Sequence, residues 1–408
     1  MNATQPLTAT YSPSDIQGFT TSLCTDPAQL PDAWDALLAA SERPSPFMRR
    51  TYLSDLHHSA SASAKTGWAP QFILLWRDTD NGAQLAAACP LYIKPHSGGE
   101  YVFDHAWAGA YAQHGLDYYP KLVCAVPFTP VMGSRLLAVD DAARAALLQA
   151  LQHHAKSVGA SSVHILFGSL ADHTAATTAG WAQRHTVQFH WQNPGVHLAT
   201  DYESFLKTLA QPKAKKARAE MRKVREAGLV WRAVAGADAS TANIDLLIQC
   251  YTQTYHEHGN APYLSPDFFK RQFTSCPAHW VLFIASHTDH GDLACSLIGL
   301  DPEAKVAYGR YWGALGRVDS LHFDACYHQP LSWCIAQGYV RFEGGAQGEH
   351  KMARGLLPVQ AQSSHYIADT EFAKAILRFT EREQLGVAGY LDELQAHSPM
   401  RAGAVASA

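Results

Sequence analysis

One stretch, from Val306 to Pro358, constrains the fold more than any other part of the chain. It opens with Ala307 to Trp312, a short segment rich in aromatic residues, as is typical of a β-strand. Apolar residues at helical spacing then predict a helix between Leu321 and Gly338. A second strand is expected over 339–343, ended by two glycines and followed by a polar loop. Because sites are usually built on loops at strand ends, that loop is either a functional site or a solvated turn.

Composition limits the classes of protein to which the chain can belong. Its 408 residues are 47% hydrophobic and 17% charged, which is typical of a globular protein of one to three domains. A net charge of -4 argues against a general nucleic-acid binder. No apolar run approaches the roughly 20 residues of a membrane span and the start resembles no leader, so we expect a cytoplasmic protein.

The cysteine and histidine residues give no signal of a metal site or a disulfide framework. The eight cysteines are scattered without a C-x-x-C pair. Although 22 histidines are present, none falls in a spacing typical of metal ligands. We therefore expect no metal.

The two halves of the chain repeat the same order of predicted elements: helices, a hairpin, a further segment, a helix and a strand. Alternating helices and hairpins predict an α/β fold built of mixed layers, and the repeat predicts an internal duplication. We expect two domains, over 20–198 and 199–397, with flexible termini at 1–19 and 398–408.

Within each half, this order resembles the GCN5-related N-acetyltransferase (GNAT) fold, and two such units in tandem resemble the Fem peptidyltransferases. More specifically, PLYIKPHSGGEYVFDHAWAGAYAQHGLDYYPKLVCAVPFTPVMGSRLL and YGRYWGALGRVDSLHFDACYHQPLSWCIAQGYVRFEGGAQGEHKMARGLLP resemble the FemAB-like N-acyltransferases of bacteria. The resemblance covers most of the chain. It implies two tandem GNAT-like domains that transfer an acyl group, from acyl-CoA as co-substrate, to an amine of a small or peptide-like acceptor. It implies no permanently bound cofactor.

Transfer of an acyl group to an amine needs a base, donors to the oxyanion and an acid for the leaving group. The base is sought among Glu343, Glu349 and His350. The acid is sought among Tyr308, Tyr311 and Tyr327, with Tyr311 preferred. We expect the catalytic groups to converge at the C-terminal end of the 339–343 strand, beside Arg310. For each of them, a surface ion pair or a core hydroxyl is the alternative.

Other residues are candidates for holding the substrates. Near the polar loop these are Arg310, Gln347, Lys351 and Arg354, which can bind carboxylates or phosphates. On the basic helix expected after Pro212 they are Arg218, Arg222 and Arg225, with a solvated charged face as the alternative. In the first half they are Tyr111, His114, Tyr119 and Lys121, within an aromatic segment, 101–130, that we expect to close over the site.

Two glycines are candidates for binding the donor's phosphates. Gly313 and Gly316 follow Arg310 in a pattern that approximates the R/Q-x-x-G-x-G/A pyrophosphate loop of acetyltransferases. Glycines let backbone N–H groups approach phosphate oxygens near a helix N-terminus. An ordinary strand-to-helix turn explains the same residues equally well.

Two other functions stay open. The first is Fem-type aminoacyl or peptidyl transfer from a charged tRNA, although the chain shows no long charged helical hairpin of the kind that can extend from Fem second domains. Salt-sensitive RNA binding would favour it. The second is a catalytically silent scaffold that only binds a ligand or partner, which absence of turnover with a bound donor would favour.

Overall fold

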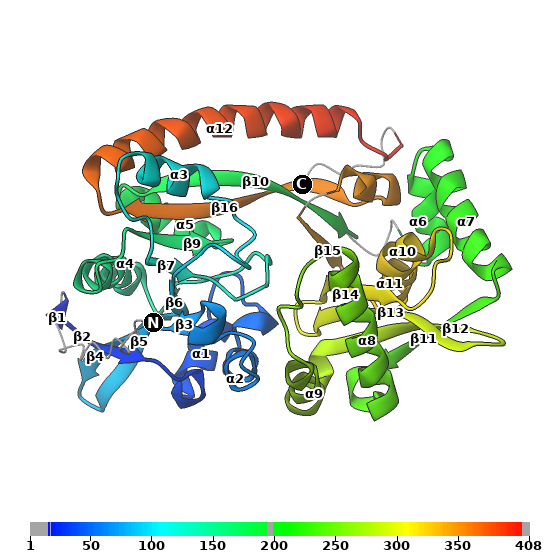
Figure 1. The fold of residues 1–408 in the computed structure, drawn as a ribbon, viewed down its shortest axis with the longest axis horizontal. Helices are drawn as coiled ribbons and strands as arrows, with labels where there is room; N and C mark the ends of the chain where they lie inside the picture. Colours follow the sequence, from blue (N-terminus) through cyan, green and yellow to red (C-terminus); the bar gives the residue numbers. More distant parts are fainter. Residues whose placement is uncertain (1–14, 17, 194–198, 347, 402–408) are drawn as a thin grey trace. The chain divides into compact units, whose positions relative to one another are not determined.

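The computed structural model describes residues 15–16, 18–193, 199–346 and 348–401. The chain divides into two compact units. Unit 1 comprises Met1–His185 and Gln362–Gln384, and unit 2 comprises Thr186–Ala361 and Leu385–Ala408. Each unit combines helices with β-sheet, which confirms the predicted α/β class (Figure 1). The units are not the consecutive ranges 20–198 and 199–397, because strand β16 (Leu357–Ile367) returns to pair with a strand of unit 1.

Unit 1 contains two sets of hydrogen-bonded strands. One is a five-stranded sheet of order β1-β2-β4-β5-β8, formed by Asp15–Ile16, Phe19–Cys24, Phe72–Thr79, Gly82–Cys89 and Leu137–Ala138. The other has the order β16-β9-β7-β6-β3, in which β9, β7, β6 and β3 are Ser162–Leu166, Lys121–Cys124, Leu91–Lys94 and Ala69–Pro70. Strands β7 and β9 run parallel.

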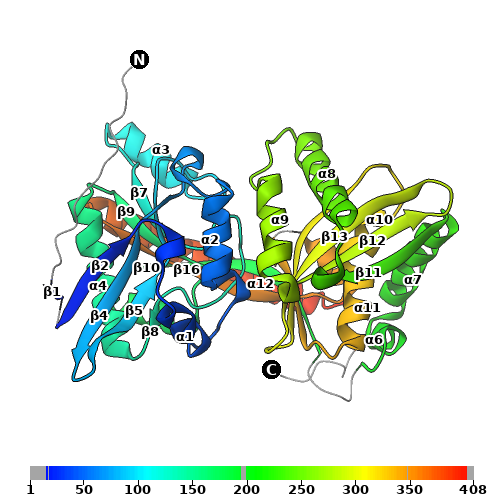
Figure 2. The ribbon, with the colours of Figure 1, turned by 90° about the horizontal axis from the view of Figure 1, so that it is seen from below.

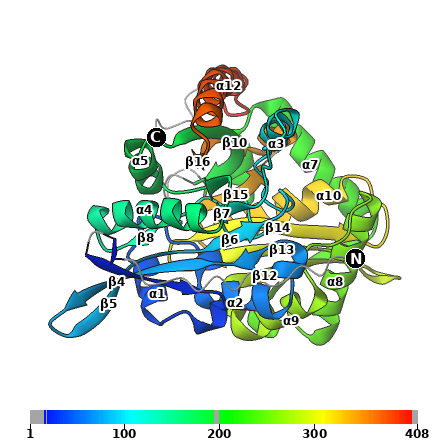
Figure 3. The same cartoon turned by 60° about the vertical axis from the view of Figure 1, so that its left-hand side comes forward.

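The helices of unit 1 are α1 (Ala33–Ala39), α2 (Arg50–His58), α3 (His105–Gln113), α4 (Asp141–Ser157) and α5 (Leu170–Thr178). Helix α4 begins where the Asp140 carboxylate accepts a hydrogen bond from the Ala143 backbone N–H at 2.7 Å. Its apolar face is buried against β4, β5 and β9. Figure 3 shows α4 and α1 on opposite sides of the strands.

In unit 2, hydrogen-bonded strands follow the order β11-β12-β13-β14-β15-β10. They are, in that order, Leu229–Ala235, Trp280–His287, Gly291–Asp301, Val306–Ala314, Arg341–Ala346 and Ala182–Gln192. Strands β14 and β15 are parallel, and β11 to β14 are antiparallel neighbours. Strands β10 and β16 each carry residues of both units.

The helices of unit 2 cover both faces of this sheet. Helices α8 (Thr241–Glu257) and α9 (Pro266–Ser275) lie on one face, whereas α6 (Tyr202–Thr208), α7 (Gln211–Glu226) and α11 (Gln329–Ala336) lie on the other (Figure 2). Helix α11 continues from α10 (Leu321–Phe323) through a π-helical turn, Asp324–His328. The 27-residue helix α12 (Thr370–Ala396) contributes to both units. Across the described residues, no helix combines the length and the apolar character needed to cross a membrane.

Candidate active site

The candidate site lies in unit 2, where two parallel strands diverge. Strand β14 pairs with β15 from Val306 to Tyr308, opposite Arg341 to Glu343. On the other edge of β14, Leu297 pairs with Tyr311 and Ile298 with Gly309, so Arg310 is the extra residue of a β-bulge. A bulge bends its strand and redirects the side chains around it. The divergence and the bulge together open the sheet at the end of β14.

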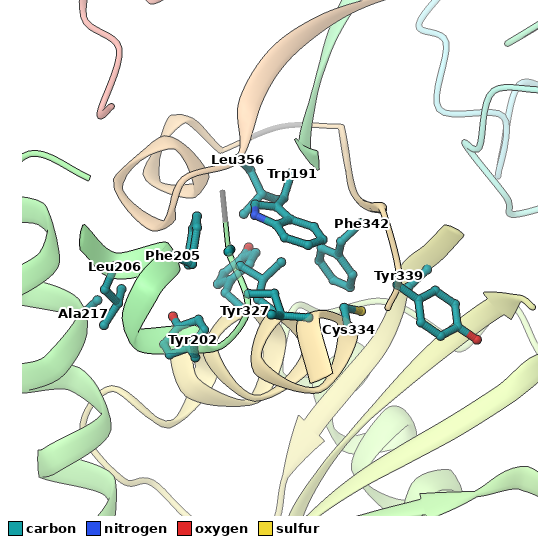
Figure 4. Close-up of a cluster of buried hydrophobic side chains, with 14 of the residues drawn as sticks. Trp191, Tyr202, Phe205, Leu206, Ala217, Tyr327, Cys334, Tyr339, Phe342 and Leu356 are labelled. Carbon is teal, nitrogen blue, oxygen red and sulfur yellow. The ribbon is translucent and has the colours of Figure 1, made fainter. Parts of the chain in front are cut away.

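A cavity of about 150 Å³ occupies this opening. Strands β13, β14 and β15 supply most of its lining, and the π-helical turn and the polar loop supply the rest. The lining residues are Ser296, Leu297, Ile298, Gly309, Arg310, Tyr311, Trp312, Cys326, Tyr327, Phe342, Gly344 and Lys351. Tyr327 and Phe342 belong to the buried apolar cluster of unit 2, so the cavity adjoins well-packed core (Figure 4).

The π-helical turn places Cys326 and Tyr327 at this cavity. Its other polar residues are fixed elsewhere: the Asp324 carboxylate accepts hydrogen bonds from Trp231 Nε1 at 2.9 Å and Gln329 Nε2 at 3.0 Å. Single π-helical turns inside α-helices occur frequently at functional sites. Because a π-helical turn is wider than an α-helical turn, the consecutive residues Cys326 and Tyr327 both line the cavity.

Lys351 is the buried cation of the site, with 6% of its surface exposed. It lies in a 3₁₀ helix, Glu349–Arg354, and donates a hydrogen bond from Nζ to the Gly345 carbonyl oxygen at 3.2 Å. Burial lowers the pKa of Lys351 to about 8. The ammonium group is therefore costly to keep charged, and it is suited to stabilise negative charge that develops in the cavity.

Tyr327 and His350 form a hydrogen-bonded pair at the edge of the cavity. The Tyr327 hydroxyl lies 3.1 Å from His350 Nε2. Partial desolvation lowers the pKa of His350, an otherwise exposed residue, and the cations Arg354 and Lys351 lower it further, which favours the neutral imidazole. Burial also raises the pKa of Tyr327. A neutral imidazole beside a protonated phenol can accept and return a proton.

A second, larger cavity, of about 590 Å³, follows the end of β14. The 314–323 segment forms one wall, and Gln253, Thr254 and Glu257 of α8 form another. Trp312 lines both cavities, so they share a wall. The predicted phosphate-binding residue Gly316 lines this larger cavity.

Gly313, the other glycine of that prediction, has a packing role. A Cβ atom there would lie 2.1 Å from the Cys250 carbonyl oxygen, so only glycine lets β14 approach α8 this closely. The tight fit against α8 accounts for this glycine without a ligand.

The predicted convergence of Glu343, Glu349 and His350 is wrong. Phe342 and Gly344 line the cavity, so the side chain of Glu343 projects to the other face of β15, because successive strand residues alternate. It is buried there, with Arg341 Nε at 3.0 Å and His190 Nε2 at 3.8 Å. Glu349 is exposed and accepts a hydrogen bond from the Tyr390 hydroxyl at 2.6 Å. Of the three predicted bases, His350 reaches a residue of the cavity lining through the contact of its Nε2 with the Tyr327 hydroxyl.

Of the predicted substrate-binding residues near the loop, Arg310 and Lys351 line the cavity. The Arg310 guanidinium also donates to the Tyr311 hydroxyl at 3.1 Å. Arg354 instead is buried: its Nε lies 3.2 Å from Glu220 Oε2, and Nη1 donates to the His350 carbonyl oxygen at 2.7 Å. Gln347 lies outside the described residues.

The three arginines predicted on the basic helix lie on the exposed face of α7. Arg218 Nη2 is 2.8 Å from Glu203 Oε2, and Arg222 Nε is 3.6 Å from Glu226 Oε1. Both pairs are solvent-exposed, and basic residues outnumber acidic ones on this face of α7.

The four aromatic-segment residues belong to unit 1, and their predicted closure over the site stays a prediction. Tyr111 is buried with its ring centroid 4.0 Å from that of Phe372, and the Tyr119 hydroxyl is 2.8 Å from Ser97 Oγ. Lys121 is fully buried, with Nζ at 2.7 Å from Glu100 Oε2. His114 is exposed.

Sequence reasoning missed Ser296, Cys326 and a buried acid, Glu220. Ser296 and Cys326 look like ordinary strand and helix residues, and nothing in the sequence marks the π-helical turn. Glu220 did carry a signal: it falls three residues after Ala217 and four before Val224, on the apolar stripe of a basic helix. An acid in such a stripe indicates a buried ion pair. Over the residues that the structure describes, no three His, Cys, Asp or Glu side chains gather as metal ligands do.

The sequence also matches a known protein family. A profile of the FemAB-like family, described as peptidoglycan biosynthesis/recognition, matches residues 28–402. The chain belongs to the FemAB-like family. This confirms the resemblance inferred from the sequence motifs. For a FemAB-like protein of this fold, membership indicates an acyltransferase-type function.

A solved structure, L-PGS, supports the same fold for this FemAB-like protein. L-PGS from Bacillus licheniformis is 11% identical, covers 86% of this chain and 96% of its own, and superposes with a TM-score of 0.50. A tandem GNAT protein from the clavulanic acid biosynthesis pathway is 10% identical, with coverages of 86% and 99% and a TM-score of 0.45. At such identities the likeness concerns the fold alone. A comparison with curated proteins gave no significant match.

Proposed function

We propose that this FemAB-like protein is an N-acyltransferase that transfers an acyl group from acyl-CoA to the amine of a small or peptide-like acceptor. The observation that carries the proposal is the cavity at the divergence of β14 and β15, whose lining includes Tyr311, Tyr327 and Lys351. A thioester carbon held there is within reach of hydroxyl groups and a buried cation. Such a site can hold two reactants together and stabilise the charge that develops between them.

The two adjoining cavities suit a long donor. Its phosphates would lie in the larger cavity, beside Gly316, Arg317 and Ser320, and its acyl end in the smaller one. Trp312 stands between the two cavities and would contact the connecting arm.

The chemistry requires one proton to leave the amine and one to reach the leaving group. The amine nitrogen attacks the thioester carbon, a C–N bond forms, and the oxyanion is stabilised by Lys351. His350, through its hydrogen bond to Tyr327, accepts the proton from the attacking nitrogen. The C–S bond then breaks, the leaving thiolate takes a proton from Tyr327, and His350 returns its proton to the Tyr327 oxygen, so both groups regain their starting state.

Transfer from an aminoacyl-tRNA is the second candidate, and the exposed basic face of α7 favours it. Lys213, Lys215 and Lys216 add to the three arginines on this face. If tRNA binds there, the logarithm of its affinity should fall linearly with the logarithm of salt concentration, as counterions are released. Absence of any salt-dependent tRNA binding would leave the acyl-CoA donor.

Thiol release from acyl-CoA in the presence of a panel of primary amines tests the proposal. We expect Tyr327→Phe to reduce turnover by about 10²- to 10⁴-fold, because the proton path through its hydroxyl is lost. Tyr263→Phe, at a 40% exposed position outside both cavities, serves as the matched control and should retain wild-type turnover. Equal turnover of the two variants, or no thiol release from any acyl-CoA, would contradict the proposal.

A further inference from the structure

The smaller cavity has an unusual balance of charge for its size. Two of its lining side chains, Arg310 and Lys351, are cationic, and its lining contains neither Asp nor Glu. Two phenols, Tyr311 and Tyr327, also belong to the lining, and the Tyr311 hydroxyl accepts a hydrogen bond from Arg310. Ile298 and Phe342, which belong to the buried apolar cluster of unit 2, give the lining apolar surface. The cavity therefore offers positive charge and hydrogen-bond donors at the end of a short apolar space.

The two cations are held in place by different means. Arg310 is the extra residue of the β14 bulge, and its guanidinium is directed along the hydrogen bond to Tyr311. Lys351 follows the left-handed Gly348 and is held by the Gly345 carbonyl oxygen. Burial lowers the pKa of Lys351 to about 8, which shows that its charge is costly here. A carboxylate in the cavity would interact favourably with both cations.

We propose that the group recognised in this cavity carries a carboxylate, which Lys351 and Arg310 bind together. This inference rests on the proposed function and names a feature of its substrate. A guanidinium and an ammonium group bind a carboxylate through charge-assisted hydrogen bonds, and the apolar wall accommodates a short carbon chain. The volume of about 150 Å³ excludes a long fatty chain.

The carboxylate has two sources. It belongs either to the acyl group, as in a short dicarboxylic half-thioester, or to the acceptor, as in an α-amino acid. Both place the same anion beside the same two cations. The experiment therefore begins with a free carboxylate and then separates the two sources.

Calorimetric titration with succinate and with neutral succinamide tests the site without any CoA ester. We expect succinate to bind about tenfold to a hundredfold more tightly than succinamide, the range that charge-assisted hydrogen bonds support. Lys351→Met and Arg310→Met should abolish that preference, and Arg310→Lys should retain part of it. Lys270→Met, at an exposed lysine of α9, is the matched control and should retain it fully.

Two further comparisons assign the source. A preference for succinyl-CoA over acetyl-CoA places the carboxylate on the donor, and a preference for glycine over glycinamide as acceptor of acetyl-CoA places it on the acceptor. Equal affinity for succinate and succinamide in the folded wild-type protein, with neither preference, overturns the inference. Succinate binding without binding of any CoA ester upholds the carboxylate site and refutes the acyl-CoA donor.

Discussion

Glu220 is an acidic residue on the buried side of an otherwise basic helix. Its carboxylate accepts a hydrogen bond from His328 at 2.8 Å and lies 3.2 Å from Arg354 Nε. His328 Nδ1 lies 2.6 Å from the Tyr202 hydroxyl on its other side. Although burial acts to raise the pKa of Glu220, hydrogen bonds from His328 and Arg354 lower it. This ion pair holds the Glu349–Arg354 turn, and with it Lys351, against α7.

Replacing Glu220 with glutamine should destabilise the protein by about 3–5 kcal/mol, because Arg354 stays buried without its counter-charge. Glu226→Gln, on the exposed end of the same helix, should cost about 1 kcal/mol or less. Urea unfolding of both variants measures the difference. Similar losses in the two variants would show that the Glu220–Arg354 pair does not anchor the turn.

The lowered pKa of Lys351 should make the free energy of unfolding depend on pH. Because its pKa of about 8 in the folded protein is below its ordinary value of 10.5, the unfolded chain binds this proton more tightly. The free energy of unfolding attributable to Lys351 should therefore rise with pH from about 8 to about 10.5 and stay constant below that window. Urea unfolding of wild type and Lys351→Met across this range isolates the effect. A difference between the two proteins that is independent of pH contradicts the burial of a charged lysine.

At the scale of elements, helix α7 has one face that packs against the core and another that is exposed and basic. Ala214, Ala217 and Val224 face the core, whereas Arg218, Arg222 and Arg225 face solvent. On the same helix, Lys223 Nζ lies 2.6 Å from Asp319 Oδ2, in the loop that lines the larger cavity. The basic face thus extends to the border of the proposed donor site.

The triple change of Arg218, Arg222 and Arg225 to glutamine should alter the free energy of unfolding by about 1 kcal/mol or less, because exposed pairs contribute little. It should weaken binding of an anionic substrate at low salt, and the same positions changed to lysine should preserve that binding. Calorimetry at two salt concentrations distinguishes the variants. Unchanged affinity in the glutamine variant would make this face a solvated surface only.

The spacing of apolar residues correctly predicted the type of most elements between Val306 and Pro358. It did not predict the local features that form the cavity. The strand expected from Ala307 to Trp312 is β14, and the helix expected over 321–338 exists, but it contains a π-helical turn. The glycines expected to end the strand at 343 instead lie within β15, which continues to pair with β10 up to Ala346. Both differences depend on tertiary packing and partner strands, which local sequence does not specify.

At the scale of the whole molecule, the duplication expected from sequence appears as two parallel strand pairs, one in each unit. In unit 1 the pair is β7 and β9, joined from Leu122 to Cys124. There, Arg135 is 1% exposed and donates to the carbonyl oxygens of Leu166 and Gly133, each at 3.1 Å. The Arg135 side chain therefore fills the space next to the ends of β7 and β9. Sequence could not reveal this, nor the return of β16 to unit 1, because both are long-range contacts.

We accordingly expect a single donor site per chain, in unit 2. Native mass spectrometry of the protein with excess coenzyme A should show one molecule bound per chain. Two molecules bound to the wild-type chain would contradict the assignment of the site to unit 2 alone.

Hydrogen exchange with and without coenzyme A tests the central claim most directly, because it locates the bound donor on the chain. The account predicts slower exchange in peptides that cover 309–328 and 341–355, where the two cavities lie. It predicts no change in peptides that cover 121–137 of unit 1. Protection in that segment of unit 1, or no protection around β14 and β15, would contradict an acyltransferase site at the divergence of these strands.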